Sequence, residues 1–165
     1  ALLLWMAIWA LGISMIVFGV DDMLILKSDQ VTQIVKSDVL WRYAAAFGFA
    51  ALAMTTVAAM SFFLSLFAEN SIGPIMATMS IIIVFTILNT LDLPIFDKTK
   101  PFLFTSHMLG WKGFFDVQIN DNNEQIVGSI ENLPAVMISA GILFLHIIGF
   151  LTASIVIFKK KDVLS

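Results

Sequence analysis

Residues 134–158 read PAVMISAGILFLHIIGFLTASIVIF, an apolar run in which His146 is the single ionisable side chain. The run is followed at once by Lys159, Lys160 and Lys161. A charge-free stretch of this length is typical of a helix that crosses a bilayer, because roughly 20 residues rising about 1.5 Å each span about 30 Å of hydrocarbon. We interpret the run as a membrane-spanning helix that ends at the basic cluster.

Three further stretches lack any formal charge, at 1–20, 43–68 and 70–91. The whole chain of 165 residues is 59% hydrophobic and 13% charged, with a mean hydropathy of +0.96. Soluble domains carry about 25% charged residues. We therefore predict an all-α, polytopic transmembrane helical bundle over residues 1–165. Its four spans lie at about 2–20, 43–67, 72–91 and 134–158, with interfacial or extracytoplasmic connections at 21–42 and 92–133.

The composition also excludes several other classes of protein. Unbroken apolar runs do not fit a transmembrane β-barrel, whose strands alternate over about ten residues. A net charge of −3 without a basic stripe excludes nucleic acid as a partner. The sequence has no Cys, no phosphate-binding loop, no nucleophile elbow and no HExxH motif, so we predict no catalytic, cofactor or metal site.

The start of the chain does not fit a secretory signal peptide. Ala1 lies inside an apolar run, with neither a starting methionine nor a basic segment ahead of it. We expect the sequence to be a fragment that further spans precede.

Both connections contain apolar residues at helical spacing. In 21–42, four residues fall on one helical face and predict a short amphipathic helix on the membrane surface; they are Val31, Ile34, Val35 and Val39. In 92–133, spacings of 4, 3 and 4 predict an interfacial helix that Gly110 and Gly113 break. Its apolar face comprises Phe104, Met108, Trp111 and Phe115.

A tight hairpin joins the second and third predicted spans. The turn reads Phe67-Ala68-Glu69-Asn70-Ser71. Ser71 is placed to cap the next helix, and Pro74 falls in its first turn, where a missing N–H is tolerated.

Few polar side chains lie inside the predicted spans, and none of them is Asp, Glu, Lys or Arg. This argues against proton relays, voltage sensors and ion-coupled carriers. The candidate pathway or interhelical polar residues are Asn89, His146, Thr55, Thr56 and Thr86. For Asn89 the alternatives are an interhelical hydrogen bond and a substrate contact. For His146 they are a neutral imidazole bonded to a hydroxyl of a neighbouring helix, a pathway-lining residue and a haem ligand.

The basic residues give conflicting signals about orientation. The two long connections hold six of them, scattered, whereas the C-terminal end holds three in an unbroken cluster next to the membrane. The positive-inside rule gives most weight to basic residues close to the ends of spans, which places the side with such residues in the cytoplasm. We therefore predict a multi-pass protein of the cell membrane with a cytoplasmic C-terminus.

Three features together resemble the permease subunits of type-2 ABC exporters, six-span proteins that work with separate ATP-hydrolysing subunits. The first is the pair of spans joined by the Phe67–Ser71 turn. The second is the run from Lys100 to Thr105, KPFLFT, followed by Trp111 and Phe114-Phe115. The third is the ending FKKKDVLS over residues 158–165. The resemblance covers the whole chain as the last four of six spans.

The resemblance implies a transport function without enzymatic activity in this chain. It implies a permease dimer, formed with a second copy or a homologous permease, whose pathway opens alternately, and an ABC ATP-binding subunit that holds ATP and Mg²⁺ on the cytoplasmic side. It makes Phe67, Glu69, Asn70 and Ser71 a minor contact with that subunit, and places the main coupling helix before Ala1. The segment before the last span would lie outside as short helices dipping into the membrane.

Two other functions stay open at this point. One is a non-transporting anchor or assembly subunit of an enzyme complex, with 92–131 as its external docking surface. The other is a haem- or quinone-binding subunit, which would place a cofactor at His146.

Overall fold

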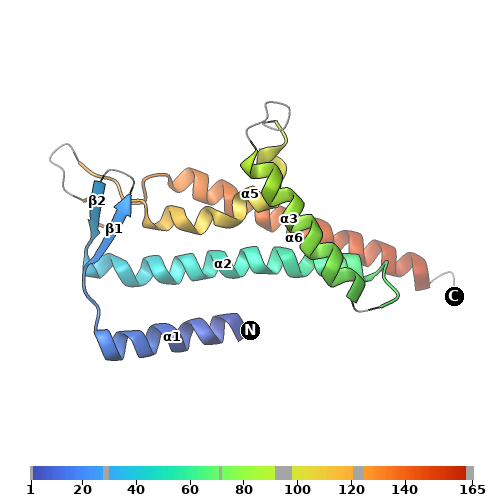
Figure 1. Ribbon diagram of the computed structural model, residues 1–165, viewed down its shortest axis with the longest axis horizontal. Helices are drawn as coiled ribbons and strands as arrows, with labels where there is room; N and C mark the ends of the chain where they lie inside the picture. The colour runs from blue at the N-terminus through green and yellow to red at the C-terminus, as the bar shows by residue number, and fades with distance from the viewer. Residues whose placement is uncertain (1, 28–29, 71, 92–97, 121–124, 163–165) are drawn as a thin grey trace. The chain divides into compact units, whose positions relative to one another are not determined.

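The computed structural model describes residues 2–27, 30–70, 72–91, 98–120 and 125–162. The chain is mostly helical (Figure 1). The elements in order are α1 (Leu2–Phe18), β1 (Met23–Lys27), β2 (Gln30–Ile34), α2 (Lys36–Ser65), α3 (Ile72–Thr90), the 3₁₀ helix η1 (Lys100–Phe102), α5 (Phe104–His107), the 3₁₀ helix η2 (Met108–Phe115) and α6 (Leu133–Asp162).

Three helices are long and apolar enough to cross a membrane: α2, α3 and residues Leu133–Lys160 of α6. They correspond to the second, third and fourth predicted spans and confirm that the protein has membrane-compatible helices. The first predicted span is shorter than expected, because α1 has 17 residues and ends before Gly19, whose φ is +74°. A helix of that length rises about 26 Å, against about 30 Å of hydrocarbon. A fourth crossing by α1 stays a prediction.

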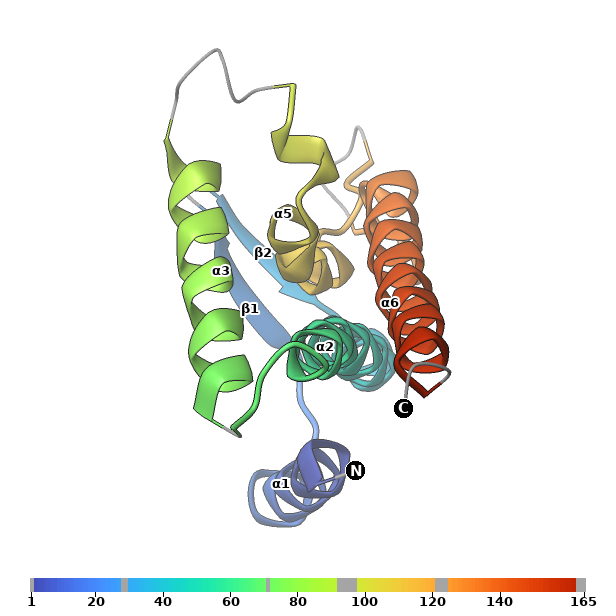
Figure 2. The same ribbon diagram turned by 90° about the vertical axis from the view of Figure 1, so that its right-hand side faces the viewer.

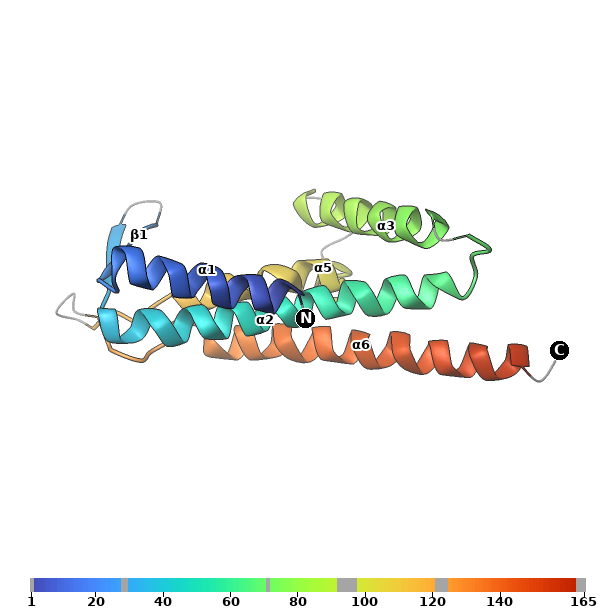
Figure 3. The ribbon, with the colours of Figure 1, turned by 90° about the horizontal axis from the view of Figure 1, so that it is seen from below.

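The amphipathic helix predicted around Val31 and Ile34 is wrong. Strands β1 and β2 form an antiparallel hairpin in which Met23 pairs with Ile34 and Lys27 pairs with Gln30. The strands lie next to the start of α2 (Figure 3). The segment VTQIV is rich in β-branched residues, which favour a strand. Pairing with Met23–Lys27 overrides the helical spacing of its apolar residues. Val39 falls in α2, which starts seven residues before the predicted span.

Asp22 closes the hairpin onto the start of α2. Its carboxylate accepts hydrogen bonds from the backbone N–H of Lys36 at 2.7 Å and from the Gln33 amide at 2.7 Å. The first N–H groups of a helix have no partner within the helix, so an acidic side chain there stabilises it.

The chain forms two compact units, and α2 contributes to both. The first comprises residues 1–51 and 110–136, and its buried side chains include Ile34, Phe49 and Val117. The second comprises residues 52–109 and 137–165. In the second unit α5 lies between α3 and α6 (Figure 2). Phe104 of α5 is buried there, 5.9 Å from the ring of Phe85 and 5.8 Å from that of His146.

Gly113 marks a close approach in the first unit and yields a prediction. A Cβ at this position would lie 2.5 Å from Cγ2 of Val136, which is buried. Gly113→Ala is therefore expected to destabilise the protein by about 1–3 kcal/mol through overpacking. The measurement is the thermal unfolding midpoint in detergent. Val136→Ala removes the methyl group that the new Cβ would meet, so the double variant should be more stable than the sum of the two single losses of stability indicates. If the losses of the two single variants simply add in the double variant, the contact is contradicted.

Candidate functional site

The turn between α2 and α3, residues 66–70, is built by backbone hydrogen bonds that tighten the end of α2. Phe67 N–H donates to the Leu64 carbonyl at 3.1 Å, and Leu66 N–H donates to that of Phe63 at 3.3 Å. Asn70 then accepts a hydrogen bond at Oδ1 from the N–H of Gly73 at 2.8 Å, in the first turn of α3. Asn70 thus caps α3, whereas Ser71, the predicted cap, lies outside the described residues.

The side chains of this turn face outward. Phe67 is 61% exposed, and Glu69 and Asn70 are also exposed. A cleft of about 460 Å³ lies between the end of α2 and the start of α3, lined by Ser61, Phe62, Ser65, Glu69, Asn70 and Ile75 among others. The turn therefore exposes an aromatic ring, a carboxylate and an amide, and Glu69 and Asn70 share the cleft with the serine hydroxyls of α2.

Asn89 hydrogen-bonds to a neighbouring helix of the second unit. Its Nδ2 donates to Oγ1 of Thr105 at 2.8 Å, and its Oδ1 accepts from the hydroxyl of Ser106 at 2.6 Å. Ser106 and Thr105 belong to α5. The amide therefore ties α3 to α5, an arrangement in keeping with the interhelical alternative.

The other predicted polar residues bond mostly within their own helices. Thr86 donates to the Ile82 carbonyl at 2.7 Å, and Thr56 donates to Leu52 at 3.1 Å as well as to Leu143 of α6 at 3.5 Å. Thr55 lies exposed on α2. His146 Nδ1 lies 2.8 Å from the Ile142 carbonyl, so its partner is backbone of the same helix and not the expected hydroxyl of a neighbour.

His107 lies in α5 and has both ring nitrogens engaged. Nδ1 is 3.0 Å from the hydroxyl of Ser139, and Nε2 is 2.8 Å from the carbonyl of Pro101. A carbonyl can only accept, so Nε2 carries a proton that it donates to Pro101. Within the ranges that the structure describes, no group of three or more His, Cys, Asp or Glu side chains could hold a metal ion.

The predicted interfacial helix is a series of short helical turns, in which Phe104 and Met108 belong to α5 and η2. In the first unit, the η2 aromatics pack against α2. Phe115 lies 5.3 Å from Tyr43 and 6.3 Å from Trp111, ring centre to ring centre. These three side chains, with Ala46, Phe47 and Ala50, line an apolar pocket of about 240 Å³.

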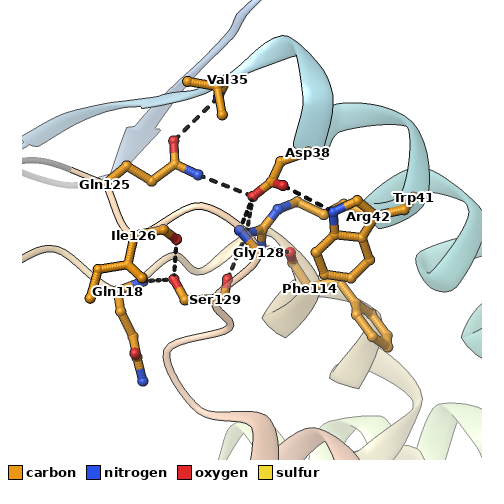
Figure 4. Close-up of polar contacts among 10 residues, drawn as sticks. All are labelled: Val35, Asp38, Trp41, Arg42, Phe114, Gln118, Gln125, Ile126, Gly128 and Ser129. Atoms are coloured by element: carbon orange, nitrogen blue, oxygen red, sulfur yellow. Dashed lines mark hydrogen bonds and ion pairs between the residues drawn. The ribbon is translucent and has the colours of Figure 1, made fainter.

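A buried ion pair at the start of α2 holds this packing in place (Figure 4). Arg42 is fully buried and Asp38 is 3% exposed. Arg42 Nη2 donates to Asp38 Oδ2 at 3.0 Å and to the Ser129 carbonyl at 2.5 Å, while Nη1 donates to the Phe114 carbonyl at 2.6 Å. The guanidinium also lies 4.8 Å from the centre of the Trp41 ring.

The Asp38 carboxylate binds the distant segment as well. Its Oδ2 accepts from the N–H of Gly128 at 2.7 Å and from the Gln125 amide at 3.4 Å, and its Oδ1 accepts from Trp41 Nε1 at 3.2 Å. We call Asp38, Trp41, Arg42, Gln125 and Gly128, with the carbonyls of Phe114 and Ser129, the Arg42 cluster. It fastens Phe114, Gln125, Gly128 and Ser129 to the first turns of α2.

The cluster lies outside the apolar span, since Asp38 precedes the charge-free stretch that begins at residue 43. Burial raises the pKa of Asp38, whereas the hydrogen bond from the Gly128 N–H and the Arg42 guanidinium lower it. The lowering is the larger effect, so the pKa of Asp38 lies below its ordinary value of 3.8. Hydrogen bonds and an opposite charge favour the ionised form of a carboxyl group.

The sequence does not predict this cluster, because Asp38 and Arg42 lie in the connection at 21–42, where it predicts only an apolar helical face. Their spacing of four residues is the available signal, since residues four apart face each other on a helix. Nothing in the sequence points to Gln125, Gly128 or the two carbonyls as partners, because they follow about 70 to 90 residues later.

Comparisons with known proteins assign no family to the chain: no family model, curated protein or solved structure matches it.

The Arg42 cluster yields a prediction about stability. Arg42→Ala leaves Asp38 as a buried charge without its counterion, and removing one partner of a buried pair costs about 3–5 kcal/mol. We expect a large fall in the unfolding midpoint in detergent and faster proteolysis at residues 125–129. Lys36→Ala, an exposed basic residue on the same helix, is the matched control. Equal midpoints for the two variants would show that the ion pair contributes nothing.

The lowered pKa of Asp38 gives a second prediction, on pH. A carboxyl whose pKa is lower in the folded state contributes stability that is complete above its unfolded pKa and is lost as the pH falls through the folded pKa. The difference in midpoint between the wild type and Asp38→Asn should therefore be constant from neutral pH to about 5 and shrink below about 4. A difference that grows with falling pH would contradict this assignment.

Proposed function

We propose that this chain is the membrane-spanning subunit of an ATP-driven exporter of the type-2 ABC class, in which it forms half of the translocation pathway. The observation that carries the proposal is the order of elements from α2 to α6. Two long apolar helices are joined by a short exposed turn, and short helices precede the last long helix. This order agrees with what the resemblance of the sequence implies.

The polar side chains of the helices support a particular kind of cargo. The charge-free stretches contain no carboxylate or ammonium group that could bind an ion, and Asn89, Thr56 and Thr86 use their hydrogen-bonding groups within the protein. Ion pathways in membranes normally contain Asp, Glu, Lys, Arg or His. The histidine in these stretches, His146, bonds to the backbone of its own helix. The proposed cargo is therefore a bulky apolar or amphipathic molecule.

ATP hydrolysis belongs to a partner in this proposal, because the chain lacks the GxxxxGK[ST] loop that cradles phosphates. Closure of the ATP-binding partners would press on the cytoplasmic ends of the helices. Helices packed through apolar contacts can then move as nearly rigid bodies between two arrangements. The exposed turn at residues 66–70 is one place where that push would be received.

The test is purification of the full-length protein from its native membrane in mild detergent. We expect a stoichiometric partner with a phosphate-binding loop, a second permease copy or homologue, and ATPase activity that vanadate inhibits. Substituting the lysine of the partner's loop should abolish the activity while the proteins still purify together.

Two results would contradict the proposal. Copurification with a different enzyme and no ATPase would favour a membrane anchor or assembly subunit. Visible absorbance that disappears in His146→Ala would favour a haem-binding subunit. Stoichiometric movement of a small cation would leave the exporter class intact and overturn the inferred cargo.

A further inference from the structure

The apolar pocket of the first unit is built from two alanines and four rings. We call it the Tyr43 pocket, and its lining residues are Tyr43, Ala46, Phe47, Ala50, Trp111 and Phe115. Ala46 and Ala50 are four residues apart, so they lie on one face of α2, one turn from each other. Their short side chains form the floor of the pocket, and the rings of the other four residues form its walls.

Contacts outside the pocket hold its walls in place. Arg42 Nη1 donates to the Phe114 carbonyl at 2.6 Å, directly before Phe115, and the Phe114 ring lies 6.1 Å from that of Phe49. The hydroxyl of Tyr43 donates to Sδ of Met23 in β1 at 3.7 Å, so this polar group has a partner outside the pocket. The pocket is therefore preformed and apolar, as binding sites for small apolar ligands usually are.

The pocket lies where the apolar stretch of α2 begins. The charges of α2 end at Arg42, and residues 43–68 carry none. The lining residues of α2 extend from Tyr43 to Ala50, about 10 Å along the helix axis at about 1.5 Å per residue. In a membrane, this part of α2 lies at the boundary between the headgroups and the hydrocarbon. The ligand that the surroundings supply there is a lipid chain.

The size of the pocket separates the possible occupants. Its volume of about 240 Å³ equals that of about eight water molecules, at about 30 Å³ each. A methylene group is of similar size, so a run of about eight carbon atoms fits. A further helix, about 10 Å across, does not. An unbranched acyl chain has both the apolar surface and the width that the pocket requires.

We propose that the Tyr43 pocket binds an acyl chain of a phospholipid, as a resident lipid of the first unit. The chain lies over Ala46 and Ala50 and packs against the four rings, where dispersion and the removal of apolar surface from water stabilise it. The inference needs only that α2 lies in a membrane. It does not rest on the proposed transport function, and the resident lipid is not the cargo.

The test uses the full-length protein, purified in detergent and stripped of lipid. It is titrated with a phosphatidylcholine that carries a photoreactive diazirine on one acyl chain, and mass spectrometry locates the label. Peptides that contain residues 43–50 and 111–115 should be labelled to saturation, and unlabelled phosphatidylcholine should displace the probe. The lipid should also raise the unfolding midpoint, because a ligand that binds only the folded state stabilises it.

Ala50→Leu fills the floor of the pocket. Overpacking should raise the apparent dissociation constant of the probe about 5- to 100-fold. If this variant does not fold, Ala50→Val, a smaller change in the same direction, takes its place.

Ala44→Leu is the matched control, because it makes the same change in the same helix at an exposed position that does not line the pocket. It should be labelled like the wild type. In the absence of lipid, both leucine variants should unfold at the midpoint of the wild type, which separates binding from folding.

Three results would overturn the inference. Labelling that rises with lipid without saturating, or that is equal in Ala50→Leu and Ala44→Leu, would show general contact with lipid and no bound chain. A copurifying protein that blocks labelling of these peptides until it is removed would show that a protein segment fills the pocket. The absence of an ATP-hydrolysing partner would contradict the proposed function alone.

Discussion

The fold of the first unit depends on the burial of Arg42. A guanidinium without exposure to water needs partners for its hydrogens, because an uncompensated buried charge costs several kcal/mol. The chain supplies a carboxylate one helical turn earlier and two carbonyls from a segment about 70 to 90 residues later. Of the three guanidinium nitrogens of Arg42, only Nε has no partner among the described residues. One side chain thus holds the backbone at Phe114 and at Ser129 against α2.

The position of this ion pair also accounts for the length of α2. Thirty residues rise about 45 Å, which exceeds the roughly 30 Å of hydrocarbon in a bilayer. The excess is the N-terminal part, residues 36–42, which carries every formal charge of the helix. Asp38 and Arg42 therefore neutralise each other just before the apolar stretch begins. The aromatic contacts of Tyr43 and Phe49 with η2 follow within the next two turns.

The sequence predicted the elements that length and composition determine. Three long helices lie close to the predicted spans because no other structure satisfies the backbone of an uncharged run in lipid. It failed where a local pattern was ambiguous or a partner was remote. Val31 and Ile34 have helical spacing, but the β-branched residues of this segment favour a strand, and pairing with Met23–Lys27 decides the hairpin. Asn70 and Ser71 are both good caps, and only the geometry of the turn shows that Asn70 bonds to Gly73.

The contacts of α2 differ in kind between the two units: they include charged hydrogen bonds in the first and a contact between rings in the second. The Arg42 cluster uses charged hydrogen bonds of defined direction, so breaking one leaves a buried group unsatisfied. In the second unit, directional hydrogen bonds tie α5 to α3 through Asn89 and to α6 through His107 and Ser139. Between α2 and α6 the contact of Phe63 with Phe150 is a ring contact, and the hydroxyl of Ser154 bonds back to its own helix at Phe150. If the chain transports its cargo by rocking helices, the α2–α6 contact of the second unit is the one that can shift without leaving a buried charge unsatisfied, whereas Phe114, Gln125, Gly128 and Ser129 stay bonded to the start of α2.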